Sequence, residues 1–234
     1  LGVDPRRFGD YVSKPYLMEK CEEAYAHVFT THYPDEERPA GRPLKISPCY
    51  DKLKSMGAVF GQKYGWERAN WFATDGMVQE DDWSFRRSKW FEAIGNEVKN
   101  VTTNVGLLDM TPFAKCRISG PDAEKFLDYF VANRIPKNIG QIGLCHALNT
   151  QGGVHSEFTI LRESENSFYL VSAGALQRLD HDYIRRFMPT DDSVHYTHLT
   201  DAMGVLVIAG PRSRELLNKV SSADFSNESF RWLT

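Results

Sequence analysis

The stretch Gln151-Gly-Gly-Val-His-Ser-Glu157-Phe-Thr-Ile160 decides the fold, because it predicts a tight turn followed at once by a β-strand. The two glycines supply the turn, since glycine tolerates positive φ without a steric penalty. The branched and aromatic residues after them are typical of a buried strand. In a strand of period two, Glu157 shares a face with Thr159, opposite the apolar side chains. This carboxylate therefore lies either on the solvated face of an antiparallel hairpin or in the lining of a ligand cavity.

Strand-like and helical runs alternate around this stretch from Val105 onward. Strands are predicted at 113–119, 142–149, 154–161, 167–172, 193–199 and 203–209, and helices at 121–132, 175–188 and 211–220. Gly120-Pro-Asp-Ala-Glu124 and Gly210-Pro-Arg-Ser-Arg-Glu215 each lead from a strand into a helix, with proline near the first helical position. This repetition of a strand, a Gly-Pro turn and a helix predicts an α+β domain with a mixed, largely antiparallel sheet and an internal pseudo-repeat.

The first third of the chain has a different character. Apolar residues recurring every three or four positions predict an amphipathic helix over 15–31. Four prolines exclude regular structure over 33–48, because each lacks a backbone donor and restricts the preceding residue. Ser47-Pro48 then predicts the start of a short helix that ends near Met56.

The next segment is rich in aromatic residues. A short strand is predicted at 58–60, and Tyr64–Phe72 is interpreted as a packed connector, since it lacks the basic stripe of a nucleic-acid surface. A helix is predicted over 86–104, with Trp90, Phe91, Ile94 and Val98 on one face.

Three basic residues lie among the prolines: Arg38, Arg42 and Lys45. They could contact a carboxylate substrate or the anionic tail of a cofactor. The alternative is that they form salt bridges with the neighbouring acids of 35–37.

Composition excludes several classes of protein. The chain has 234 residues, with 41% hydrophobic residues, 25% charged residues and a net charge of −3, which is ordinary for a globular protein and gives no sign of a nucleic-acid partner. No apolar run approaches the roughly 18–20 residues needed to cross a bilayer, so no membrane partner is expected. The four cysteines form no CxxC pair, which indicates reduced thiols and neither a disulfide framework nor a metal site. Because the sequence does not begin with Met, we expect a piece of a longer protein.

Several motifs resemble one enzyme family, the dimethylglycine and sarcosine dehydrogenases. They are the proline-rich stretch from His32 through Leu53, the segments Gly57–Gly61 and Tyr64–Arg68, and Gly106-Leu-Leu-Asp-Met-Thr-Pro-Phe113 with the turn before Glu157. Asp4-Pro-Arg-Arg-Phe-Gly9 resembles the end of the family's FAD-binding oxidase domain. The resemblance implies the end of that domain at 1–10, a connector at 11–85, and the N-terminal part of a T-protein-like folate-binding domain at 86–234.

The resemblance implies a two-site enzyme. A flavin, FAD, bound outside this chain would oxidise an N-methylated glycine, and the folate domain would capture the one-carbon unit as methylenetetrahydrofolate. Glu157 stands where the T-protein has a catalytic aspartate that hydrogen-bonds the folate amine. Phe113 and Thr159 stand at positions that imply contact with folate, and Asp109 begins a segment that braces the pocket. Alone, the chain is expected neither to hold FAD nor to complete the folate pocket.

The resemblance leaves several points open. The electron acceptor is oxygen or an electron-transfer flavoprotein, and the compartment is the cytoplasm in a bacterium or the mitochondrial matrix in a eukaryote. One alternative is a stand-alone aminomethyltransferase, which would lack residues 1–72. The other is a non-catalytic regulator similar to the regulatory subunit of pyruvate dehydrogenase phosphatase.

Overall fold

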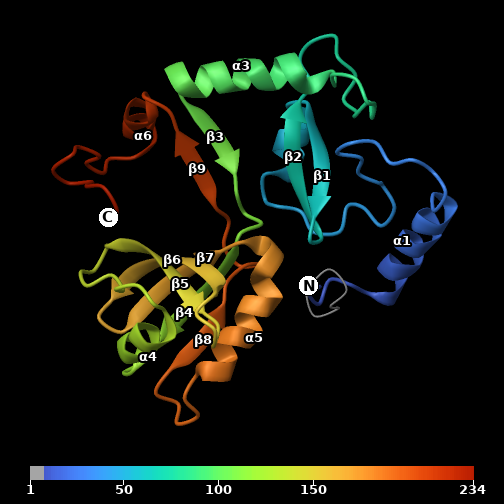
Figure 1. Ribbon diagram of the computed structural model, residues 1–234. Coiled ribbons are helices and arrows are strands. Elements are labelled where there is room, and N and C mark those ends of the chain that lie inside the picture. The colour runs from blue at the N-terminus through green and yellow to red at the C-terminus, as the bar shows by residue number, and fades with distance from the viewer. Residues whose placement is uncertain (1–7) are drawn as a thin grey trace. The chain divides into compact units, whose positions relative to one another are not determined.

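The computed structural model describes residues 8–234, which divide into two compact units (Figure 1). One unit consists of residues 111–205 and 222–234, and the other of residues 8–110 and 206–221. The helices are α1 (Lys14–Ala26), α2 (Tyr50–Ser55), α3 (Trp90–Thr103), α4 (Ala123–Phe130), α5 (Gln177–Phe187) and α6 (Ser213–Val220), with a 3-10 turn η2 (Gly174–Leu176). The strands are β1 (Ala58–Lys63), β2 (Trp66–Phe72), β3 (Gly106–Asp109), β4 (Ala114–Ser119), β5 (Ile142–Leu148), β6 (Val154–Ser164), β7 (Ser167–Ser172), β8 (His195–His198) and β9 (Leu206–Ala209).

The first unit is built on a five-stranded antiparallel sheet in the order β5-β6-β7-β4-β8. Period-two alternation sends Phe158 and Ile160 to one face, where both are almost completely buried. Helices α4 and α5 cover this face, and α4 contributes Phe126 and Phe130 while α5 contributes Ile184 to the same core cluster. The other face carries the side chains of Glu157, Thr159 and their cross-strand neighbours.

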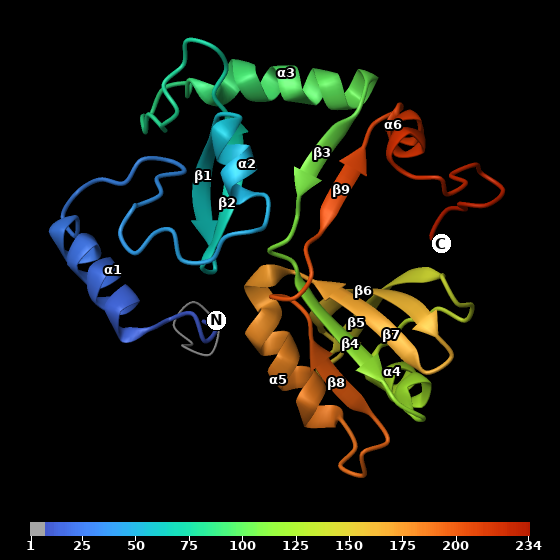
Figure 2. The same ribbon diagram turned by 180° about the vertical axis from the view of Figure 1, so that it is seen from behind.

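The second unit contains a hairpin in which β1 pairs antiparallel with β2. Tyr64 and Gly65 form its turn with φ values of 51° and 84°, and positive φ at both positions matches the right-handed twist of paired strands. Helix α2 lies against the hairpin in Figure 2. The segment Tyr64–Phe72 is packed, as interpreted from the sequence, because Trp66 and Trp71 are buried. Its strand was not predicted, since the turn before it has no Asn-Gly or Asp-Gly signal.

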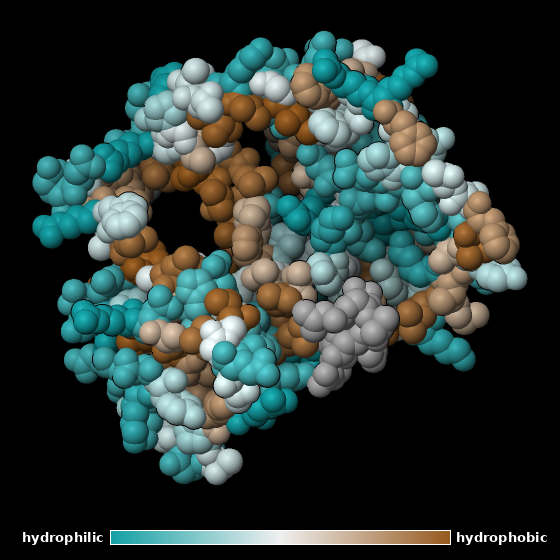
Figure 3. Space-filling view, viewed as in Figure 1, coloured by the Kyte–Doolittle hydropathy of each residue, from teal (hydrophilic) through white to brown (hydrophobic). Residues whose placement is uncertain are grey.

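Strand β3 was absent from the sequence prediction. It pairs antiparallel with β9, about a hundred residues later, and such a distant partner leaves no local signal. Leu107 and Leu108 of β3, and Leu206 and Val207 of β9, are each at least 40% exposed. Figure 3 shows this ribbon as hydrophobic surface.

The two Gly-Pro turns repeat one local geometry. Gly120 and Gly210 have φ values of 122° and 121°, and the added Cβ of any other residue would lie 2.4 Å from a backbone oxygen at each site. In each turn the second residue after glycine donates its N–H to the carbonyl that faces the glycine: Asp122 to Ser193 and Arg212 to Asn104. The predicted repeat is therefore present in the backbone. The prolines precede the N-caps of α4 and α6, so the predicted position near the first helical residue was slightly too late.

Several predicted helices differ in their ends or faces. Helix α1 ends at Ala26, earlier than predicted, and none of its residues is buried. Helix α2 begins at Tyr50 with Cys49 as its N-cap. On α3, Trp90 and Ile94 pack against the β1–β2 core, whereas Phe91 and Val98, which were predicted to share their face, are exposed.

The basic residues among the prolines make contacts within the protein. Arg42 forms two bonds to Glu67, and Arg38 bonds to Glu36. The ammonium of Lys45 lies 4.4 Å from the ring centre of Trp66. The structure thus supports the salt-bridge alternative for Arg38 and Arg42. The partner of Arg42, Glu67, lies outside the acids of 35–37 that were expected from the sequence. No helix of residues 8–234 is long and apolar enough to span a bilayer.

Candidate functional site

Glu157 lies on the face of the sheet opposite α4 and α5. Its side chain is 60% exposed, and one carboxylate oxygen, Oε2, is 3.1 Å from Nε2 of His146. His146 is its direct cross-strand partner, on β5. The alternation predicted from the sequence is confirmed, because Glu157 and Thr159 share this face while Phe158 and Ile160 are buried.

Asn133 contacts both the backbone and the ring of His146. Oδ1 of Asn133 accepts the backbone N–H of His146 at 2.8 Å and lies 3.1 Å from Nδ1 of the ring. An atom that accepts an N–H must be the amide oxygen, so a hydrogen bond between the ring and this atom requires a proton on Nδ1.

If Nδ1 carries this proton, the contact between His146 and Glu157 is a hydrogen bond only when a further proton lies between the two atoms. Nε2 of a ring protonated at Nδ1 is either a bare acceptor or the second N–H of an imidazolium. A carboxylate can only accept, so the 3.1 Å contact forms a hydrogen bond if the imidazolium donates to the carboxylate or a neutral carboxyl donates to Nε2. The pair can therefore hold and exchange a proton, which is the chemical requirement for acid–base work.

A second carboxylate on this face is fully occupied by protein donors. Arg117 binds Glu163 through two bonds of 2.6 and 2.8 Å, and Ser167 donates a third of 3.0 Å. The side-chain hydrogen bond from Arg117 holds the pKa of Glu163 below its usual range. Glu163 is thus a poor proton acceptor, and Glu157 is the better candidate.

The surroundings of Glu157 include exposed apolar surface. Leu144 pairs with Thr159 across β5 and β6 and is 54% exposed, and Thr159 pairs with Val171 of β7. This face combines a carboxylate, an imidazole and apolar side chains that are open to solvent. That combination suits a ligand that has both an apolar ring and an amine.

Phe113 is placed less directly. It is half-buried and precedes β4, at the same end of the sheet as Glu157 but with β7 between the two strands. The ammonium of the buried Lys115 fixes this segment by donating to the carbonyls of Thr111 at 2.6 Å and Phe113 at 2.9 Å. The structure thus brings together Glu157 and Thr159, and leaves Phe113 at a distance from them.

Sequence reasoning missed two members of the site. The sequence singled out neither His146 nor Asn133 as a member of the site. The pairing of His146 with Glu157 depends on the register of β5 against β6. Asn133 follows α4 in a loop, where sequence periodicity carries no information about its contacts.

Two protein-family models match most of the chain. Residues 49–234 match the GCVT N-terminal domain, and residues 1–47 match the central domain of FAD dependent oxidoreductases. The predicted boundaries at 10 and 85 remain predictions, and the part of them that concerns residues 1–7 lies outside the described residues.

Individual relatives agree with the resemblance seen in the sequence. The mitochondrial dimethylglycine dehydrogenase of Mus musculus is 37% identical over 100% of this chain, and the match covers 27% of that protein. The mitochondrial pyruvate dehydrogenase phosphatase regulatory subunit of Mus musculus is 28% identical over 97% of the chain, and the match covers 27% of that protein. The chain therefore spans about a quarter of the length of these relatives.

A solved structure confirms the predicted fold class. The glycine cleavage system aminomethyltransferase T from Bartonella henselae superposes with a TM-score of 0.62 at 21% identity, over 75% of this chain and 43% of that one. At this level of identity the likeness establishes the fold alone.

Proposed function

This chain belongs to the GCVT N-terminal domain family, and we propose that it is part of a flavin- and folate-dependent dehydrogenase of N-methylated glycines, dimethylglycine or sarcosine. The identity to dimethylglycine dehydrogenase along the whole chain supports this, as does the match to the central domain of FAD dependent oxidoreductases. In the proposed reaction the substrate is oxidised at an N-methyl group, and the one-carbon unit passes to tetrahydrofolate.

The flavin is proposed to bind outside the described residues. They contain no G-x-G-x-x-G motif, which the phosphates of a dinucleotide cofactor would need. The electrons are proposed to pass to oxygen or to an electron-transfer flavoprotein. The proposed compartment is the mitochondrial matrix in a eukaryote and the cytoplasm in a bacterium.

The Glu157–His146 pair carries the folate half of the proposal. Tetrahydrofolate, when bound, supplies a nucleophilic amine. Glu157 would accept the proton of this amine at a carboxylate oxygen, because its side chain is exposed and does not have the bidentate arginine that occupies Glu163. His146 would keep the second proton at Nε2 and stabilise the carboxylate until that transfer.

The neighbouring side chains would hold and orient the ligand. Thr159 follows Glu157 on the same face and offers a hydroxyl, and Leu144 beside it offers apolar surface to a ring. Phe113 is proposed as a further apolar contact, from the end of the sheet where Glu157 lies.

The test uses the full-length protein that carries this chain. It is mixed anaerobically with dimethylglycine, with and without tetrahydrofolate, while flavin absorbance and free formaldehyde are followed. We expect the flavin to bleach, tetrahydrofolate to suppress formaldehyde, and Glu157→Gln to restore formaldehyde without slowing the bleaching. Glu165→Gln is the matched control, since it makes the same change at an exposed position on the turn after β6.

Two other outcomes would favour other functions. A full-length protein that binds no flavin would refute the proposed dehydrogenase activity and favour a non-catalytic regulator. The similarity to the phosphatase regulatory subunit makes a regulator the second candidate. A flavin-free protein that transfers one-carbon units to tetrahydrofolate would instead be an aminomethyltransferase.

A further inference from the structure

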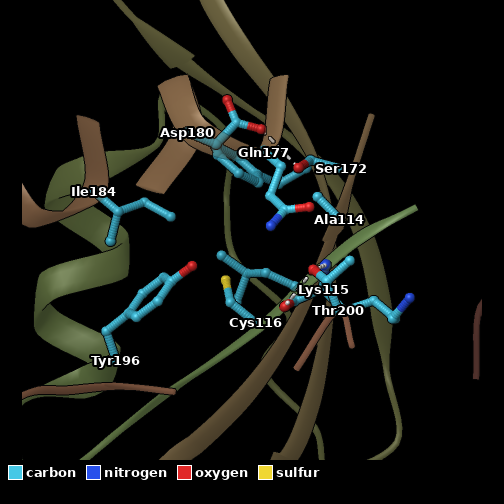
Figure 4. A pocket seen from close by; sticks show the side chains of 11 residues that line it. Ala114, Lys115, Cys116, Ser172, Gln177, Asp180, Ile184, Tyr196 and Thr200 are labelled. Carbon is cyan, nitrogen blue, oxygen red and sulfur yellow. Dashed lines mark hydrogen bonds between the residues drawn. The ribbon is translucent and has the colours of Figure 1, made fainter. Parts of the chain in front are cut away.

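A buried carboxylate lies beneath the strand that carries Glu157. Asp180 of α5 is 4% exposed, and its two oxygens accept hydrogen bonds from Ser156 of β6 and Ser172 of β7, each at 2.6 Å. Figure 4 shows Asp180 beside Ser172 at the edge of a small cavity of about 10 Å³. Burial raises the pKa of Asp180, and the two serine bonds act in the opposite direction.

The two serine–Asp180 hydrogen bonds lie just beyond the point where the backbone pairing of β6 with β7 ends. The pairing of β6 with β7 begins at Thr159, opposite Val171, and β7 ends at Ser172. Ser156 and Glu157 thus extend beyond β7 and pair only with β5. The Asp180 carboxylate therefore connects Ser172, the last residue of β7, to Ser156 on this extension of β6, where no backbone hydrogen bonds join the two strands.

A second residue of α5 holds the other strand of the same hairpin. The hydroxyl of Tyr183 donates to the carbonyl of Leu148 on β5 at 2.7 Å. Its ring stacks on His155, two residues before Glu157, with ring centres 3.7 Å apart and planes 9° apart. Asp180 and Tyr183 are three positions apart and so lie on one face of the helix.

We propose that Asp180 is a positioning residue: by clamping β6 to β7 from beneath, it fixes the segment of β6 that carries Glu157 and keeps this carboxylate at hydrogen-bonding distance from His146. This inference rests on the proposed folate function for its catalytic meaning, but the clamp itself does not. Loss of the clamp displaces a reacting carboxylate, and a misplacement of about 1 Å can cost on the order of a hundredfold in rate.

The experiment compares variants of the full-length protein. Asp180→Ala removes the clamp, and Ser156→Ala removes its bond to β6 with a smaller change in volume, should Asp180→Ala fail to fold. Asp182→Ala is the matched control on the same helix, because its carboxylate is 40% exposed and pairs with Arg178. We expect Asp180→Ala to lower tetrahydrofolate-dependent capture of the one-carbon unit between about ten- and a hundredfold, with flavin bleaching unchanged.

The double variant separates positioning from general destabilisation. If Asp180 acts through Glu157, Asp180→Ala has no further effect on capture in the Glu157→Gln background, since the two losses are not additive. An equal loss in both backgrounds, or no loss in the wild-type background, overturns the proposal.

Hydrogen exchange provides a readout that does not depend on activity. We expect amides of residues 154–160 to exchange faster in Asp180→Ala than in Asp182→Ala, because the clamp holds that segment. Unchanged exchange there overturns the clamp. If the wild-type protein does not capture one-carbon units at all, the proposed function fails, and the exchange measurement still decides whether Asp180 holds the Glu157 segment.

Discussion

Replacing Arg42 with leucine should destabilise the unit that contains the β1–β2 hairpin more strongly than any single change at a surface ion pair. Nε and Nη2 of Arg42 bind the two oxygens of Glu67 at 2.9 and 2.7 Å, and Nη2 also donates to the carbonyl of Phe60 at 2.8 Å. The pair fixes the proline-rich segment to the hairpin. The Glu67 side chain is 3% exposed and that of Arg42 is 15% exposed, so little water can replace the guanidinium.

The expected cost follows from this burial. Arg42→Leu leaves a desolvated carboxylate without its partner, which costs about 3–5 kcal/mol of unfolding free energy. The double variant Arg42→Leu/Glu67→Leu removes both charges and leaves only the Phe60 carbonyl short of a donor, so its cost should fall to about 1–2 kcal/mol. Arg117→Leu is the matched control: it breaks a bidentate pair of similar geometry whose side chains are 34% and 28% exposed, at a cost of about 1 kcal/mol or less.

Urea unfolding followed by tryptophan fluorescence measures these differences, because Trp66 and Trp71 lie on β2. The m-value should be the same for all variants, so that shifts of the midpoint report stability alone. If Arg42→Leu lies within about 1 kcal/mol of wild type, or the double variant is as unstable as the single one, the carboxylate is hydrated and the reasoning fails.

Three further predictions concern the rest of the chain. Phe158→Ala, at a site that is 1% exposed, should cost about 3–5 kcal/mol in urea unfolding, whereas Leu144→Ala, at 54% exposure, should stay within about 0.5 kcal/mol. Gly95→Ala should stabilise α3 by about 0.5–1 kcal/mol and raise the melting temperature, because the added Cβ would meet no atom within 4 Å. Arg117 lowers the pKa of Glu163, so this pair stabilises the fold above the unfolded carboxyl value near 4.5 and ceases to do so as pH falls. The stability difference between wild type and Glu163→Gln, about 1 kcal/mol or less, should therefore shrink as pH falls below this value.

The sequence was informative where local pattern and tertiary environment agree. The alternation around Glu157 predicted β6 and its two faces, because one face of that strand is buried under α4 and α5. It was not informative where the partner is distant in the chain. Strand β3 exists only through its pairing with β9. Strand β2 follows a turn in which Tyr64 has a φ of 51°, a conformation that residues other than glycine rarely adopt.

The candidate site depends on both local pattern and distant pairing, and the turn between β5 and β6 connects the two. Oδ1 of Asn149 accepts the N–H groups of Gln151 and Gly153, each at 2.9 Å, and Gly152 adopts a φ of 81°. This turn sets the register between the strands on either side of it, and that register places His146 opposite Glu157. A slip of one residue would send every side chain of one strand to the other face, burying the imidazole among the core residues. The carboxylate could therefore be predicted from its own strand, whereas its proton partner could not, because the partner is chosen by the conformation of the turn.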